Sequence, residues 1–89
     1  MQKYFYLGGF KMEFKVLLNM VEDVKKFVKI AERYDMDITV RSTKSKFEVD
    51  GTSIMGMFTL DLSDPVVVTV YNDDNGKKFK SEVEKYIVH

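Results

Sequence analysis

The spacing of apolar positions changes along the first half of the chain, and each change predicts a new element. Residues 13–18 alternate and then become apolar, which is typical of a β-strand. Residues 20–34 carry apolar side chains at helical spacing, with lysine and arginine on the other face. Asn19 and Glu22 have the spacing of a capping box at the start of this helix. We therefore expect a strand followed by an amphipathic helix.

The second half of the chain predicts two strands, a short helix, a further strand and a last helix. Residues 38–41 and 46–50 are strand-like and flank a polar turn, which indicates a hairpin. Ser53 is of the residue type that caps a helix, and we place a short helix from there to residue 57 or 58. Residues 66–71 form the strongest strand pattern, and apolar side chains recur at helical spacing after residue 76.

The predicted order of elements is therefore β-α-β-β-α-β-α. The first and last helices each have an apolar stripe that needs a partner, and one face of a sheet supplies it. We predict an α+β fold, a two-layer open-faced sandwich with a four-stranded, mostly antiparallel sheet and the helices on one face. The order alone leaves open which strands pair.

Composition narrows the classes of function. The chain has 89 residues, enough for one small domain, and its 14 basic and 14 acidic side chains cancel. A neutral chain without interleaved basic and aromatic residues gives no support to nucleic-acid binding. There is no cysteine, no secretory signal pattern and no apolar run near the roughly 20 residues that span a bilayer. We therefore expect a cytoplasmic protein that neither crosses a membrane nor binds a metal or another cofactor.

The first eleven residues differ from the rest of the chain. They hold four aromatic side chains and a Gly8-Gly9 pair, so we separate an N-terminal aromatic arm at 1–11 from a domain at 12–89. The arm is either an extension from an upstream start codon or an expression remnant, or a real element that packs on the body or on a second copy. Burial of large rings favours packing, with strand addition to a sheet edge as one mode, which includes a homo-oligomer through residues 1–11.

The segment DGTSIMGMFTL, residues 50–60, carries the clearest likeness to a known family. It resembles the regulatory-serine segment of HPr, the histidine-containing phosphocarrier of the bacterial phosphoenolpyruvate–sugar phosphotransferase system. Tyr34-Asp35, followed by residues 37–40, is similar to the exit from the first helix of HPr. The resemblance runs from about Met12 to the C-terminus and implies an HPr-like fold.

The resemblance also implies site residues and partners. In HPr of Gram-positive bacteria, a dedicated kinase phosphorylates the serine that corresponds to Ser53, and the phosphoprotein acts with a transcription regulator. Ser53 is thus the candidate for regulatory phosphorylation, with HPr kinase and a transcription regulator as implied partners. The candidate partner-binding residues are Ile54, Met55, Met57 and Phe58, of which Ile54 and Phe58 are the expected exposed pair. From the residues alone, a plain N-cap is the favoured role of Ser53, and only the resemblance gives the regulatory role equal weight. For the four apolar residues, core packing and partner binding have equal weight.

The chain departs from HPr at the start of the first helix. HPr-like chains carry histidine, arginine and proline there, whereas residues 18–24 here contain none of the three, and Glu22 and Asp23 occupy the first turn. A helix N-terminus attracts a phosphoryl group, but two carboxylates beside it repel one. His89 is the only histidine, and it stands at the end of the chain. We therefore expect no catalytic residue and no phosphotransfer activity.

These observations favour a regulatory, serine-phosphorylatable and partner-binding HPr-like protein of the phosphotransferase system. The first alternative is an interaction module on the same fold that works without phosphorylation. The second is a phosphocarrier that uses another residue.

Overall fold

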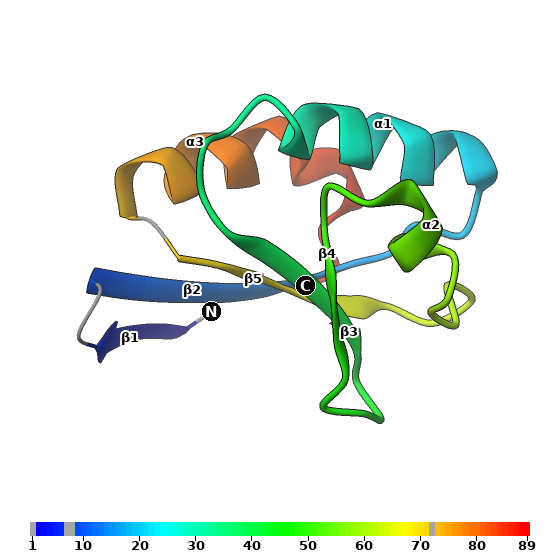
Figure 1. Cartoon of the computed structure of the whole chain (residues 1–89), viewed down its shortest axis with the longest axis horizontal. Helices are drawn as coiled ribbons and strands as arrows, with labels where there is room; N and C mark the ends of the chain where they lie inside the picture. Colours follow the sequence, from blue (N-terminus) through cyan, green and yellow to red (C-terminus); the bar gives the residue numbers. More distant parts are fainter. Residues whose placement is uncertain (1, 7–8, 72) are drawn as a thin grey trace.

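The computed structural model describes residues 2–6, 9–71 and 73–89, with side chains described for 11–71 and 74–89. The chain runs through β1 (Gln2–Tyr6), β2 (Gly9–Val16), α1 (Val21–Ala31), β3 (Ile38–Ser42), β4 (Glu48–Asp50), α2 (Ile54–Met57), β5 (Val66–Val70), α3 (Asp73–Glu82) and a 3-10 turn, η1 (Glu84–Tyr86). The strands form one antiparallel sheet in the order β1-β2-β5-β3-β4. Helices α1 and α3 lie side by side over one face of it (Figure 1). The predicted two-layer α+β sandwich is therefore confirmed.

The sheet has one strand more than the four we predicted, because residues 2–6 pair with β2. The register runs from Gln2 opposite Glu13 to Tyr6 opposite Gly9, so β1 and β2 are antiparallel neighbours. β2 itself begins at Gly9 and crosses the boundary that we placed after residue 11. The arm thus adds a strand to the edge of its own sheet, and the packing of its side chains lies outside the described residues.

The core lies between the sheet and the two long helices. Alternate residues of β2, β3 and β5 face the helices, as the period of a strand requires. Phe79 of α3 has no exposed surface and lies at the centre, with its ring 5.6 Å from those of Phe27 and Tyr34 and 6.3 Å from that of Phe14. Edge-to-face packing of this kind adds to the gain from burial. α1, α3 and β2 are thus held together through one aromatic cluster.

The start of α1 differs from the predicted capping box. Met20 is the N-cap, in extended conformation and without a side-chain cap, and Asn19 is exposed. The reason is the burial of Leu18, together with the hydrogen bond from the Leu17 amide to the Tyr86 carbonyl at 2.8 Å. These contacts hold the incoming chain, so the helix begins one residue later than Asn19 would need. The local capping pattern was therefore a wrong prediction.

The turn at Asp50-Gly51 depends on a close approach between two chain segments. A Cβ atom on Gly51 would lie 2.8 Å from Cγ2 of Ile38 and 3.2 Å from the Ile38 carbonyl oxygen. The Gly51 amide donates to that same carbonyl at 2.8 Å. Only glycine fits here without a shift of β3, and this contact sets the position of the chain that leads into α2.

Thr69 offers a stabilising substitution in the middle strand. It is almost fully buried, and its hydroxyl has no hydrogen-bond partner among the described residues. Thr69→Val keeps the side-chain shape and removes this unmatched group, so we expect the free energy of unfolding to rise by about 1 kcal/mol. Urea denaturation monitored by circular dichroism measures it. The control is Thr39→Val, which removes a hydroxyl that donates to Glu48, and a larger gain there would contradict the argument.

Candidate functional site

The segment around Ser53 forms a tight, hydrogen-bonded surface loop. The Ser53 hydroxyl accepts from the Gly56 amide at 3.0 Å, so Ser53 caps α2 as the sequence predicted. The carboxylate of Asp50 accepts from the amide of Thr52 at 2.8 Å and from its hydroxyl at 2.7 Å. Because these hydrogen bonds hold the loop on both sides of Ser53, the Ser53 hydroxyl occupies a defined, half-buried position.

The four predicted partner-binding residues separate into two groups. Ile54, Met55 and Phe58 are exposed, and Met55 exposes 80 % of its surface. Met57 has no exposed surface and belongs to the core, so it is unavailable to a partner and the prediction was wrong for this residue. A one-turn helix has a single inward face, and Met57 occupies it.

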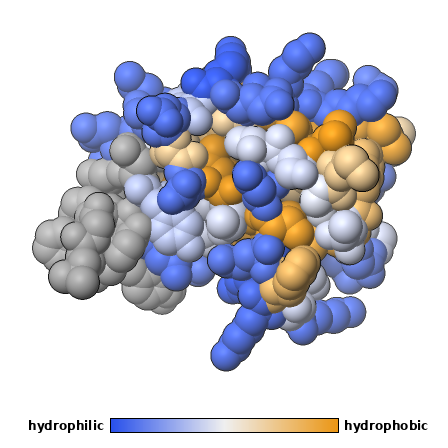
Figure 2. Space-filling model, in the orientation of Figure 1, coloured by the Kyte–Doolittle hydropathy of each residue, from blue (hydrophilic) through white to orange (hydrophobic). Residues whose placement is uncertain are grey.

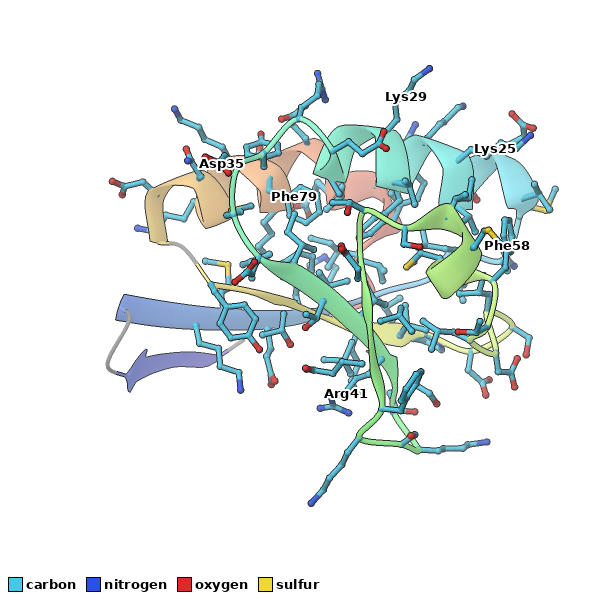
Figure 3. The ribbon with its side chains drawn as sticks, in the orientation of Figure 1. Lys25, Lys29, Asp35, Arg41, Phe58 and Phe79 are labelled. Carbon is cyan, nitrogen blue, oxygen red and sulfur yellow. The ribbon has the colours of Figure 1, made fainter. Side chains whose placement is uncertain are left out.

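The apolar surface continues onto the start of α1. Met20 and Val21 are both more than half exposed, although they fall within residues 20–34, whose apolar side chains we expected to face the sheet. Helices α1 and α2 contact each other, and Figure 2 shows apolar surface gathered at the end of the molecule where they meet. Figure 3 shows Phe58 beside α2 at this end. We call this the α1–α2 surface; its residues are Met20, Val21, Ile54, Met55 and Phe58.

Sequence reasoning missed Met20 and Val21 as surface residues. The available signal was their position at the N-cap and at the first residue of the helix. An apolar side chain there lies at the end of the helix, so the pattern of buried positions further along does not require it to be buried. An exposed apolar cluster on a protein this small indicates a binding surface for another molecule.

The start of α1 is electrostatically unsuited to a phosphoryl group. Met20 stands at the N-cap, and the carboxylates of Glu22 and Asp23 lie in the first turn. Negative side chains there interact favourably with the helix dipole, and they repel an incoming anion. The α1–α2 surface therefore combines apolar contacts with negative charge at the helix N-terminus.

His89 lies apart from this surface. Its side chain is exposed, with Nε2 3.6 Å from a carboxylate oxygen of Glu84. It borders a hollow of about 410 Å³ together with residues of the sheet such as Lys15 and Arg41. No residue from the start of α1 borders that hollow. Ser53 does not border that hollow either.

Other chemistry finds no support in the described part of the chain. The residues there contain no group of three or more side chains that could hold a metal ion. None of the helices described is both long and apolar enough to cross a bilayer.

Residues 23–87 match the family model described as "PTS HPr component phosphorylation site". This chain belongs to the PTS-HPr family. Members of the HPr family are phosphocarriers and contact other proteins of the phosphotransferase system. The matched part of the chain begins at Asp23, so Met20 at the N-cap of α1 lies just before it.

Two solved structures illustrate the likeness in fold. The phosphocarrier protein HPr from Bacillus anthracis str. Ames has 16 % sequence identity and a TM-score of 0.66, with 88 % of this chain and 98 % of that chain covered. HPr-C-His from Thermoanaerobacter tengcongensis has 24 % identity and a TM-score of 0.62, with coverages of 82 % and 88 %. No curated protein sequence is a match for this chain. At these identities, the two structures establish the HPr fold.

Proposed function

We propose that this HPr-family chain is a regulatory, partner-binding protein of the phosphotransferase system and carries no phosphate on histidine. The observation behind the proposal is the start of α1, where a methionine caps the helix and two carboxylates fill its first turn. A phosphoacceptor there needs an imidazole and positive potential, and both are lacking. The α1–α2 surface retains what a protein partner needs, which is exposed apolar area on a defined backbone.

The decisive experiment is phosphorylation by phosphoenolpyruvate and the general phosphotransferase enzyme. We expect no acid-labile phosphate on this chain, while a histidine-containing HPr in the same assay is labelled. Label on His89, or on any other residue of this chain, would overturn the absence of phosphotransfer. Intact-mass measurement before and after mild acid treatment distinguishes phosphohistidine from phosphoserine.

Ser53 is the proposed site of regulation, with HPr kinase as the modifying enzyme and a transcription regulator as the reader. Its hydroxyl is half-buried in a loop on the rim of the α1–α2 surface, so a phosphate there would add charge beside the partner contacts. We expect HPr kinase and ATP to add one phosphate, which is lost in Ser53→Ala. That variant also removes the cap of α2, at a cost of about 1 kcal/mol in stability. If a kinase shown to be active leaves this protein unmodified, the regulatory part of the proposal is wrong.

A second candidate function is an interaction module that works without phosphorylation. The exposure of Ile54, Met55 and Phe58 favours it, because these side chains need no phosphate to bind an apolar partner surface. In that case Ser53→Ala leaves partner affinity unchanged. Under both proposed functions we expect the protein in the cytoplasm, together with the other proteins of the phosphotransferase system.

A further inference from the structure

The outer surfaces of α1 and α3 enclose a groove that lies outside the α1–α2 surface. It has a volume of about 590 Å³ and is open to solvent. Its walls come from α1 on one side and from the end of α3 and η1 on the other. The lining residues are Lys26, Lys29, Ile30, Glu32, Arg33, Glu82, Lys85 and Tyr86.

The rim of the groove is positively charged. Four cationic side chains and two carboxylates line it, which leaves a net of two positive charges. One carboxylate, Glu82, is already paired, because it accepts hydrogen bonds from Arg33 at 2.5 Å and from the hydroxyl of Tyr34. The hydrogen bond from Tyr34 lowers the pKa of Glu82, so this side chain stays ionised and engaged at neutral pH. Glu32 is the one remaining carboxylate on the rim.

The remaining lysines of the groove have no such partner. Lys26 and Lys29 make no ion pair with any described residue, and they lie three positions apart on one face of α1. Figure 3 shows Lys29 pointing away from the sheet. From the opposite wall, the ammonium group of Lys85 lies 5.2 Å from the ring centroid of Tyr86. Three lysines from two walls therefore line one groove, together with Glu32 and the paired Glu82.

The floor of the groove is apolar. Ile30 is half-buried, and Tyr86 exposes 6 % of its surface. The positively charged rim and the apolar floor together favour a ligand that carries both acidic and apolar groups.

We propose that the α1–α3 groove binds an acidic peptide segment of a protein partner, anchored by one large apolar side chain. A small molecule would be poorly enclosed, because such sites normally bury most of their ligand and this groove is open. Acidic side chains along the peptide contact Lys26, Lys29 and Lys85, while the apolar side chain covers Ile30 and Tyr86. The groove is thus a second interaction surface, independent of Ser53 and of the α1–α2 surface.

The probe is a synthetic peptide of alternating Glu and Ala around a central Phe, titrated into the isotope-labelled full chain by NMR. We expect chemical-shift changes at Lys26, Lys29, Ile30, Lys85 and Tyr86, which weaken as salt is added. A peptide with every Glu replaced by Gln is expected to bind at least about tenfold more weakly. Equal affinity of the two peptides would overturn the proposal.

Charge reversal tests the site itself. Lys29→Glu combined with Lys85→Glu should raise the dissociation constant by about tenfold or more, because it reverses one cation on each wall. The matched control is Lys77→Glu with Lys78→Glu, the same change at exposed positions of α3 outside the groove. Circular dichroism establishes that both double variants fold. Equal weakening by the two pairs, or equal binding of single-stranded oligothymidylate, would overturn the proposal and indicate non-specific attraction of polyanions.

Discussion

Phe79→Ala is expected to lower the free energy of unfolding by about 3–5 kcal/mol, because it leaves a cavity at the centre of the aromatic cluster. The ring has no exposed surface and contacts elements from both layers. Small domains have a total stability of roughly 5–15 kcal/mol, so the variant will be close to unfolding at room temperature. The midpoint of urea denaturation, followed by circular dichroism, gives the loss.

The matched control for this change is Phe47→Ala. Phe47 exposes 68 % of its surface, so the same truncation should alter the stability by less than about 0.5 kcal/mol. If Phe79→Ala proves too unstable to measure, Phe79→Leu retains most of the volume, with an expected loss of about 1–2 kcal/mol. Similar losses for Phe79→Ala and Phe47→Ala would contradict the described packing.

Ile54→Asp is expected to weaken binding to HPr kinase by about thirtyfold or more, because it places a charge within the α1–α2 surface. Truncation of a central apolar contact commonly costs 2 kcal/mol or more, and a buried unpaired carboxylate adds to this. Ile54 is partly exposed in the free protein, so the fold should tolerate the change. Isothermal titration calorimetry with the purified kinase measures the affinity.

Phe47→Asp is the control for this substitution, since it adds the same charge at an exposed aromatic residue on the β3–β4 connection. It should bind like the unmodified protein. Ser53→Ala separates the two proposed functions, because it abolishes phosphorylation and leaves the apolar contacts in place. If the kinase binds the Ile54→Asp variant with unchanged affinity, its binding site lies elsewhere on the molecule.

The elements with long, strongly periodic patterns were predictable from the sequence. The strand at Val66–Val70 and the helix at Val21–Ala31 follow directly from their apolar spacing, although the helix ends three residues earlier than expected. Tyr34 explains the early end, since its amide closes a turn onto Ala31 and its ring packs on Phe79. Tertiary packing therefore sets the C-terminal end of α1, which the local sequence pattern does not define to within a few residues.

The candidate site was less predictable, because α2 has four residues and periodicity over one turn does not determine which face is buried. The prediction of Ile54 and Phe58 as surface residues came from resemblance and agrees with their exposure, whereas Met57 lies in the core. The groove between α1 and α3 depends on Lys29 and Lys85, which are 56 positions apart and meet only through the tertiary fold. Nothing in their local sequence distinguishes them from ordinary solvated lysines.

The position of β5 in the sheet has a consequence for biosynthesis. β2 and β3 do not pair with each other, and each takes β5 as its neighbour. On the ribosome, β2 and β3 therefore emerge before their shared partner, and nascent chains that stop before Val66 cannot assemble the sheet. Assembly of the sheet must therefore wait until Val66–Val70 has been synthesised, which leaves apolar strand surface open to chaperones until that point.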